Sequence, residues 1–241
     1  MSGRRPDNRL GAGHLGRHRP GVHDSEAIED YAKALHLISE RTGEPVATSA
    51  VAELLGVSAG SVSAMLKRMA TLGLVELESY RGARLSESGR LVALEMVRHH
   101  RLIELFLTEV LGMGWDRVHA EAEVLEHYIS EELEERMAAA LGDPEIDPHG
   151  DPIPDRGLGL VSREGVALSD LDSGVAATIA RVSDSDPGVL RYLGECGMRP
   201  GAELVVGERD EVDGSIALRV GGHSRRVGVG IARRVVVSPT G

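Results

Sequence analysis

The chain has 241 residues, of which 41% are hydrophobic, and 27 Lys and Arg against 38 Asp and Glu give a formal net charge of −11. This composition supports packed cores, and no run of about 18 apolar residues occurs that would cross a membrane. The arginine-rich N-terminus has no apolar block behind it and therefore no secretory signal, so we expect a cytoplasmic protein with no membrane partner.

The excess negative charge is concentrated in the middle of the chain. Residues 1–98 hold 13 basic and 12 acidic residues, residues 99–150 hold 3 and 13, and residues 151–241 hold 11 and 13. The overall charge argues against a nucleic-acid partner, but the nearly neutral first segment does not. The single cysteine, Cys196, excludes a thiolate cluster, so a bound metal would need nitrogen and oxygen ligands.

The first helix is predicted to begin at about residue 24. Residues 1–23 are rich in Gly, Arg and His without a hydrophobic period, which indicates a disordered basic tail. Beyond them, apolar residues recur at three- and four-residue spacing up to the "RTGEP" break: Ile28, Tyr31, Leu35 and Ile38.

The next segment predicts a helix-turn-helix followed by a wing. A short helix at about 48–55 is followed by a turn centred on Gly56, a second helix at 58–72 and two short strands around "YRG". Gly56 stands where a positive φ is wanted, and Ser58 can cap the second helix.

Short hydroxyls and cations line the exposed face of this second helix, and they suit phosphate oxygens and base edges in a major groove. The wing adds two arginines in reach of the adjacent backbone. The candidate DNA-contacting residues are Ser58, Ser61, Ser63, Lys67, Arg68, Arg81 and Arg84. Because the helix carries no Asn or Gln, we expect sparse base readout with a contribution from DNA shape. The alternative is an ordinary helical hairpin whose polar face is only solvated.

Two longer helices are predicted in the acidic segment, at Leu91 to Leu111 and Val118 to Leu141, with Asp116 as N-cap of the second. A helix turns by about 100° per residue. That turn places Glu121 on a solvated face and four residues together on the opposite one: His119, Glu123, Glu126 and His127. Apolar neighbours predict that this polar stripe is partly buried: Val124, Leu125, Tyr128 and Ile129.

A metal site is predicted where these helices pack. His100 and Glu104 are spaced i and i+4 on the preceding helix, so both side chains can meet one ion. Packing the two faces together would crowd carboxylates unless a cation intervened. Imidazole plus carboxylate favours Mn, Fe(II), Co or Zn, and the oxygen-rich balance favours Mn. The alternative is a solvated Glu-rich helix, as we expect for "EELEER" at 131–136.

The last third of the chain predicts a small β-barrel. A loop rich in Pro and Asp, "GDPEIDPHGDPIPDRG", indicates a boundary. After it come β-branched runs, with one helix at about Asp186 to Glu195; the runs are "SGVAATIARVS", "AELVVGERD", "SIALRVGG" and "RRVGVGI".

Seven pieces of the chain together resemble the diphtheria-toxin-repressor family of metal-dependent transcription regulators: "EDYAKALH", "LLGVSAGSVSAMLKRM", "GLVE", "LSESGR", "RHHRLIELFL", "VHAEAEVLEH" and "DPHGDPIP". The resemblance implies a mainly α protein with a small β domain. The implied parts are the tail 1–23, a winged helix-turn-helix domain 24–95, a helical metal-binding and dimerisation domain 96–150, a linker 151–164 and an SH3-like, FeoA-like β-barrel 165–241. It also implies a homodimer, not an enzyme, that binds a palindromic operator in double-stranded DNA.

The resemblance implies a primary metal site formed by Asp30, Glu123, Glu126 and His127. The iron-responsive branch of the family has Met where Asp30 stands and Cys where Glu123 stands, whereas the manganese-responsive branch has Asp and Glu. The chain resembles the manganese branch, in which Mn(II) acts as corepressor of metal-uptake genes. Two Mn(II) per chain are implied, and Fe(II), Co(II) or Zn(II) can substitute.

An ancillary site is implied at His100, Glu104 and His119, with Asp186 of the SH3-like domain completing it. Lys33 departs from the pattern, because short manganese regulators carry a glutamate ligand there, and this favours two separated sites. We expect the carboxylates to repel one another without metal, which leaves the domains mobile. Because ligating imidazoles must be unprotonated, metal affinity should fall below about pH 6.5. The alternatives are an iron- or zinc-responsive repressor on this scaffold, or a non-DNA metalloprotein using the same residues.

Overall fold

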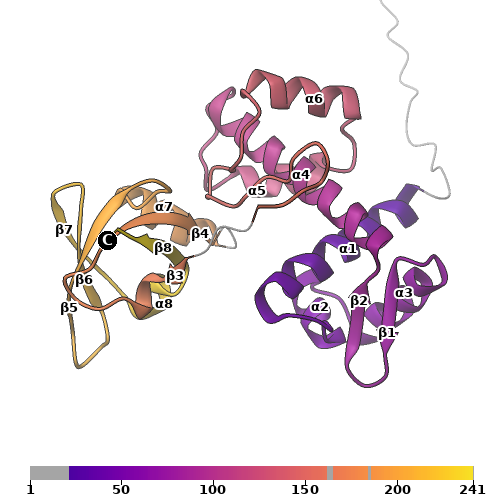
Figure 1. The fold of residues 1–241 in the computed structure, drawn as a ribbon, viewed down its shortest axis with the longest axis horizontal. Coiled ribbons are helices and arrows are strands. Elements are labelled where there is room, and N and C mark those ends of the chain that lie inside the picture. The colour runs from indigo at the N-terminus through magenta and orange to yellow at the C-terminus, as the bar shows by residue number, and fades with distance from the viewer. Residues whose placement is uncertain (1–21, 162–164, 184–185, 241) are drawn as a thin grey trace, which may run out of the picture.

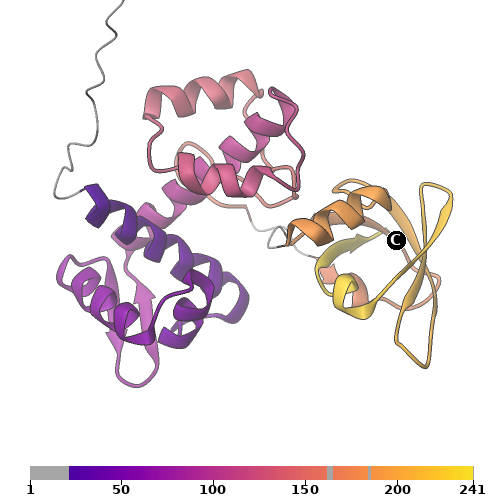
Figure 2. The same cartoon turned by 180° about the vertical axis from the view of Figure 1, so that it is seen from behind.

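The computed structural model describes residues 22–161, 165–183 and 186–240. It contains two helical units and a sheet unit, which Figures 1 and 2 show from opposite sides. Most of the predicted tail lies outside the described residues, but Val22 and His23 already belong to the first helix.

The N-terminal unit is the predicted winged helix-turn-helix. Its elements are α1 (Val22–Thr42), α2 (Thr48–Leu55), α3 (Ala59–Thr71), β1 (Val75–Glu78) and β2 (Gly82–Leu85). Gly56 adopts a φ of 65° after α2, and the Ser58 hydroxyl accepts a hydrogen bond from the Ser61 amide at the start of α3. The local signals in the sequence therefore place the turn correctly. The core of the unit joins all three helices to the hairpin through Tyr31, Leu35, Val51, Val62, Leu66, Met69 and Val75.

The base of the wing is attached to the connection between α1 and α2. Val46 and Ala83 exchange backbone hydrogen bonds of 2.8 and 3.0 Å. Gly82, next to this bridge, has a φ of 122°, and a Cβ there would lie 1.9 Å from the Val46 carbonyl oxygen. Only glycine allows the wing to approach this closely.

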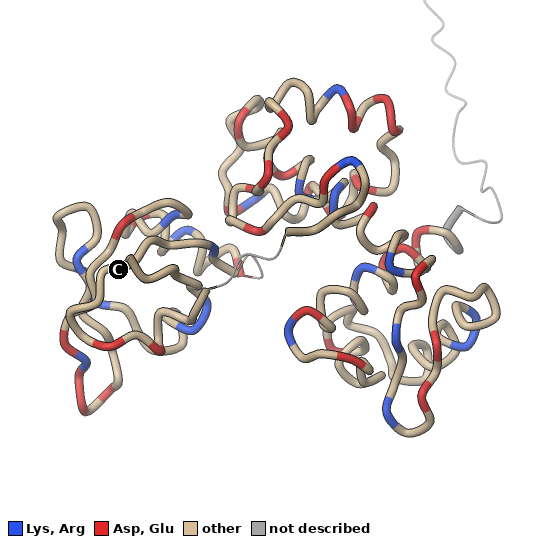
Figure 3. The backbone as a smooth tube through the Cα atoms, in the orientation of Figure 1, with Lys and Arg blue, Asp and Glu red and all other residues tan. Residues whose placement is uncertain are grey.

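The second unit is built on α4 (Glu87–Glu109), which packs against α1, and on α5 (Val118–Leu125) and α6 (Glu131–Ala140). The single helix predicted over Val118 to Leu141 was wrong, because the chain leaves the helix after Glu126 and Ser130 caps a new one by accepting from the Leu133 amide. Asp116 does not cap α5; its carboxylate accepts from Arg191 at 3.1 Å. Figure 3 shows the acidic residues of this unit along α6 and the adjoining loops.

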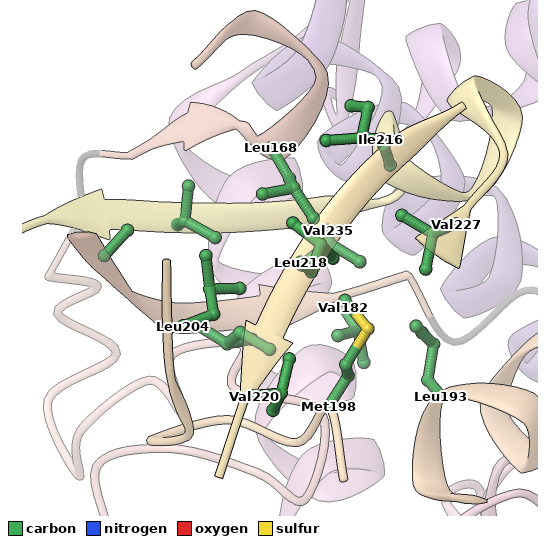
Figure 4. Packing of buried hydrophobic residues seen from close by; sticks show 14 of the residues in the cluster. Leu168, Val182, Leu193, Met198, Leu204, Ile216, Leu218, Val220, Val227 and Val235 are labelled. Atoms are coloured by element: carbon green, nitrogen blue, oxygen red, sulfur yellow. The ribbon is translucent and has the colours of Figure 1, made fainter. Parts of the chain in front are cut away.

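The third unit is a six-stranded antiparallel sheet in the order β3-β8-β4-β5-β6-β7, which confirms the predicted small β domain. The elements are β3 (Val166–Ala167), η1 (Leu168–Asp170), β4 (Ala176–Val182), α7 (Pro187–Glu195), β5 (Glu203–Arg209), β6 (Ile216–Val220), β7 (His223–Val227), α8 (Val229–Ala232) and β8 (Val235–Pro239). Figure 4 shows Leu193, Met198, Leu204 and Val220 among the side chains of its core. The predicted "RRVGVGI" strand is only half right, since α8 begins at Val229.

The sheet unit is attached to the helical unit before it by buried contacts. Trp115, which precedes α5, is a member of the sheet unit's core, and Arg199 lies 4.3 Å over its ring. The Val182 amide of β4 donates to the His149 carbonyl oxygen at 2.9 Å. The loop around His149 therefore packs between the two units.

None of the described helices is long and apolar enough to cross a membrane by itself. One pair, α2 with α3, meets the length and composition together but is bent by 111°.

Candidate metal centre and DNA interface

Three groups of ligand-type side chains lie where α1, α4, α5 and the loop around His149 meet. Within each group the possible ligand atoms lie within 4.8 Å of one another. We name them the Asp30 group (Asp30, Glu126, His127), the His100 group (His100, His119, Glu123) and the Glu104 group (Glu104, Asp147, His149).

The Asp30 group joins the winged helix to the second unit. His127 Nε2 lies 3.1 Å from Asp30 Oδ1 and 3.8 Å from Glu126 Oε1. Its Nδ1 lies 2.8 Å from Glu29 Oε2, a contact that we did not predict. A carboxylate that accepts from one ring nitrogen orients the other nitrogen as a ligand, so Glu29 suits that supporting role. Burial raises the pKa of Asp30.

Glu123, predicted as the fourth primary ligand, lies in the His100 group instead. Its Oε1 is 3.6 Å from His100 Nδ1 and 3.8 Å from His119 Nε2. The structure therefore brings three of the four predicted primary residues together and places the fourth one helical turn away, on the same face of α5.

Lys33 lies between the Asp30 and His100 groups. Its ammonium donates to Glu123 Oε1 at 2.9 Å and to Glu126 Oε1 at 2.5 Å, and the residue is only 7% exposed. Burial opposes its charge, but Glu126 and Glu123 outweigh burial and raise the pKa of Lys33. This cation links α1 to α5 and offsets part of the repulsion expected among the carboxylates, while the expected mobility of the domains stays a prediction.

The predicted ancillary residues His100, Glu104 and His119 are in contact. Glu104 Oε1 lies 3.0 Å from His100 Nε2 and 3.2 Å from His119 Nδ1. His100 Nδ1 lies 2.5 Å from Glu126 Oε2, which connects this cluster with the Asp30 group. Burial disfavours the imidazolium, but hydrogen bonds to Glu104 and Glu126 raise the pKa of His100 to about 10.

His149 and Asp147 complete the cluster around Glu104, and we did not predict either. His149 is fully buried, with Nδ1 3.3 Å from Glu104 Oε2 and Nε2 2.8 Å from the Trp115 carbonyl oxygen. Asp147 Oδ1 accepts from the amides of His149 and Asp151, which shapes the loop. The "DPHGDPIP" piece carries part of the family resemblance, but the loop rich in Pro and Asp that contains it predicted only a boundary.

Asp186, expected to complete the ancillary site, lies elsewhere. It caps α7 by accepting from the amides of Gly188 and Val189 at 2.9 and 3.2 Å, and Arg234 approaches it at 3.4 Å. An Asp before Pro187, the first residue of a helix, is well placed for this capping role. In the structure, the loop residue His149 contacts Glu104 where Asp186 was expected to do so.

The apolar neighbours of the stripe do not shield it. Val124, Leu125 and Tyr128 are 62%, 40% and 65% exposed. The stripe is partly buried as predicted, with Glu126 buried and Glu123 exposed, but these neighbours are not the reason. Glu121 is exposed as expected. Burial of the cluster comes from α1 and α4 instead. "EELEER" is solvated except for Glu134, whose carboxylate accepts from Arg98 and lies 2.9 Å from His99 Nε2.

The predicted DNA-contacting residues lie on α3 and the wing. Ser61, Ser63, Lys67 and Arg68 are exposed on α3. The Ser58 and Ser61 hydroxyls are 2.9 Å apart. On the wing, Arg81 donates to Glu78 at 2.9 Å, while Arg84 donates to Glu78 and, at 3.2 Å, to Glu44. Contact between these arginines and phosphates therefore competes with ion pairs within the protein.

The three units match three family models. Residues 24–83 match the N-terminal DNA-binding domain of iron-dependent repressors, residues 86–155 their metal-binding and dimerisation domain, and residues 166–239 the FeoA domain. Over 210 residues the chain is 31% identical to the iron-dependent repressor IdeR of Mycobacterium tuberculosis. This alignment covers 82% of this chain and 90% of the relative. A winged helix joined to clustered His and Glu ligands defines a class of metal-responsive DNA-binding proteins. The chain belongs to the iron-dependent repressor, or diphtheria toxin repressor, family of metal-dependent transcriptional repressors, whose members are regulators and not enzymes.

Solved structures of manganese regulators are similar over most of the chain. A manganese-dependent transcriptional repressor in complex with manganese is 38% identical, with a TM-score of 0.82 over 88% of this chain and 100% of that one. The manganese regulator SloR is 33% identical, with a TM-score of 0.72 over 88% and 98%. ScaR with bound Zn2+ is 30% identical, with a TM-score of 0.73 over the same shares.

Proposed function

We propose that this protein is a manganese-dependent repressor in which Mn(II) is the corepressor of metal-uptake genes. The observation that carries the proposal is the set of donors at the junction. Asp30, Glu126 and His127 lie together with Glu123 beside them, and the candidate groups among the described residues contain no sulfur. Carboxylate and imidazole donors suit Mn(II), whereas thiolates and thioethers favour softer metals. Cys196 lies at the end of α7, in the sheet unit.

Two ions per chain fit these donors. Asp30, Glu123, Glu126 and His127 would hold the primary ion, and an ancillary ion would be held by His100, Glu104 and His119, with His149 against Glu104. When bound, the metal would supply two positive charges that offset the negative charge of the carboxylates.

The residues of the primary site belong to two units, and this gives the switch its mechanism. Asp30 lies on α1 of the winged helix, whereas Glu126 and His127 follow α5 of the second unit. Holding these residues together fixes the orientation of α3 relative to the dimer partner. His100 Nδ1 lies 2.5 Å from Glu126 Oε2, so the position of Glu126 depends on the ancillary residues as well.

The two copies of α3 in a homodimer would read a palindromic operator in successive major grooves. Ser58, Ser61, Ser63, Lys67 and Arg68 would face the DNA, with Arg81 and Arg84 of the wing on adjacent phosphates. The exposed apolar side chains Val124, Leu125 and Tyr128 supply a surface for the dimer partner.

Operator binding measured during metal titration tests the proposal. Mn(II) should promote binding to a palindromic operator, and binding that is the same after chelation would reject the switch. Asp30→Met with Glu123→Cys should shift preference toward Fe(II), since both replacements introduce sulfur. A matched control is Asp30→Met with Glu121→Cys, because Glu121 points away from the site. If metal preference is unchanged in the first variant, the ligand assignment is wrong.

An iron- or zinc-responsive repressor on the same scaffold is the second candidate. Its support is that the iron-dependent repressor IdeR is a relative over most of the chain, and that the similar ScaR has been solved with Zn2+. Operator binding compared across Mn(II), Fe(II) and Zn(II) at buffered free-metal concentrations separates the two candidates.

A further inference from the structure

Lys33 is a buried cation that the metal switch as described does not use. It is one of only two lysines in the chain, the other being Lys67 on α3. Its Nζ lies 2.9 Å from Glu123 Oε1 and 2.5 Å from Glu126 Oε1. These two carboxylates belong to different candidate metal groups, so one ammonium engages both of them.

An ammonium uses the same carboxylate lone pairs that a metal ion would use. It is a compact positive charge with three donors and no acceptor, on a flexible four-carbon stem. A divalent ion on either carboxylate would lie within a few ångströms of this charge, where repulsion in a buried environment is weakly screened. The two cations are therefore mutually exclusive partners of Glu123 and Glu126.

We propose that Lys33 is a tethered competitor of the regulatory metal, and that its ammonium must leave Glu123 and Glu126 before these residues coordinate an ion. This inference rests on the proposed function and adds a residue that sets metal affinity. The primary metal ion must displace a cation that the chain supplies at very high local concentration. Lys33 thereby raises the free-metal concentration at which the protein responds, and it disfavours weakly binding cations.

The structure provides space for the displaced side chain. A cavity of about 650 Å³ is lined by Lys33 together with His100, His119 and Glu123. Glu40 and Asp151 also line it, so an ammonium that turns into the cavity meets other carboxylates. Lys33 can therefore move by rotation about its side-chain bonds, while α1 keeps its backbone.

Amine labelling of the wild-type protein tests the displacement directly. A short pulse of acetic anhydride, followed by mass spectrometry, reports the labelling of Lys33 relative to the exposed Lys67 in the same molecule. After chelation and removal of metal, we expect Lys33 to be labelled much more slowly than Lys67. Saturating Mn(II) should raise the Lys33-to-Lys67 ratio at least fivefold. An unchanged ratio at saturation would overturn the proposal.

Direct metal titration tests the competition. Lys33→Gln and Lys33→Met remove the charge at similar length, and free Mn(II) can be counted by its electron paramagnetic resonance signal. We expect both variants to bind Mn(II) at least tenfold more tightly than the wild type. Arg136→Gln is the matched control, because it removes one cation from an exposed ion pair with Glu132 and should leave affinity unchanged. Equal or weaker binding by both folded Lys33 variants would contradict the inference.

The two proposals fail in different ways. If wild-type protein binds Mn(II) and then the operator, but the Lys33 ratio stays constant, only the competition is overturned. If wild-type protein binds no Mn(II), the proposed function is rejected and the competition with it. The labelling result needs no substituted protein, so misfolding of a variant cannot obscure it.

Discussion

His149 Nδ1 lies 3.3 Å from Glu104 Oε2, although 45 residues separate them in the chain. The other ring nitrogen, Nε2, lies 2.8 Å from the Trp115 carbonyl oxygen. The rings of His149 and Trp115 stack with their centroids 5.7 Å apart. A histidine fixed at both nitrogens holds the carboxylate that it contacts in one orientation. The loop around His149 therefore belongs to the candidate metal centre and connects it with the sheet unit.

Replacing His149 should weaken the ancillary site selectively. His149→Phe keeps a ring against Trp115 but loses both nitrogen contacts, so we expect about a tenfold loss of affinity for the ancillary ion. The primary ion should bind nearly as before. Isothermal titration with Mn(II) separates the two events, and His223→Phe on β7 is the control for an exposed histidine. Equal effects of the two substitutions would exclude the role given to His149.

Metal binding should release protons. Burial lowers the pKa values of His100 and His149, but neighbouring carboxylates outweigh burial and raise these values to about 10 and about 9. Both imidazoles are therefore charged at neutral pH. His100 must lose a proton before it can coordinate, and a divalent ion near Glu104 disfavours the charged form of His149. Affinity for Mn(II) should therefore keep rising with pH through the neutral range toward the pKa values of these histidines. With an ordinary histidine the rise would end at about pH 6.5. Calorimetry in two buffers of different ionisation enthalpy measures the protons, and buffer-independent heats would contradict this.

The same shifts set the sign of the pH dependence of stability without metal. A group whose pKa is raised by folding stabilises the protein below its unfolded value and loses that contribution as pH rises through the folded value. For His100 this window runs from 6.5 to about 10. The melting temperature of chelated protein should therefore decrease over this range, and in wild type more than in His100→Gln. A parallel decrease in both proteins would argue against a charged His100.

The dimer surface can be tested at Val124, which is 62% exposed on α5. Val124→Asp introduces a charge that would have to be desolvated in an apolar interface, so the dimer dissociation constant should rise tenfold or more. Val212→Asp is the control, since Val212 is 97% exposed in the turn before β6. Sedimentation velocity measures both, and an undiminished Val124→Asp dimer would place the interface elsewhere.

Lys67 should contribute to DNA binding without contributing to sequence preference. A phosphate contact adds the same energy on any sequence, so Lys67→Ala should weaken specific and nonspecific binding equally and lower the salt dependence by about one ion. Arg136→Ala changes the net charge by the same amount at a distant surface. Fluorescence anisotropy at several salt concentrations measures the slope of the logarithm of DNA affinity against the logarithm of salt concentration. A loss confined to the operator sequence would indicate base contact instead.

The wing depends on a glycine at its base. Gly82→Ala would place a Cβ 1.9 Å from the Val46 carbonyl oxygen at a φ of 122°, so the clash adds to the backbone strain. We expect a loss of about 3 kcal/mol in the free energy of unfolding, near the upper end for single substitutions. Gly43→Ala tests strain alone, since its φ is 75° with nothing within 4 Å, and should cost about 1 kcal/mol. Equal urea midpoints for Gly82→Ala and Gly43→Ala would show that the wing accommodates the methyl group.

The features that could be predicted are those with local signals. Gly56 and Ser58 fix the helix-turn-helix within a few residues of chain, and the i, i+4 pair His100 and Glu104 needs only one helix. The break after α5 was missed because Ser130 stands inside a pattern that continues as helix on both sides. Capping by a serine hydroxyl then competes with helix continuation, and the sequence does not show which wins.

Contacts across the chain could not be predicted from spacing. Lys33 and Glu126 are 93 residues apart, and the sequence marks Lys33 only as an unusual residue for its place. His149 follows Asp and Pro in a loop without a period, so nothing local indicates that it reaches Glu104. Asp186 was expected at the site, yet its local position before Pro187 already favoured a capping role.

The shortness of α5 has a consequence for how this protein tolerates changes in length. His119 and Glu123 lie within its eight residues, and Glu126 is its C-cap. Because each residue turns the helix by about 100°, deleting one residue between His119 and Glu126 would rotate one of these two side chains away from α1 and α4. His119 and Glu126 would both be kept, yet their side chains would no longer meet at the same site. Insertions and deletions should therefore be rarer in α5 than in the turn between β5 and β6, where Val212 is 97% exposed.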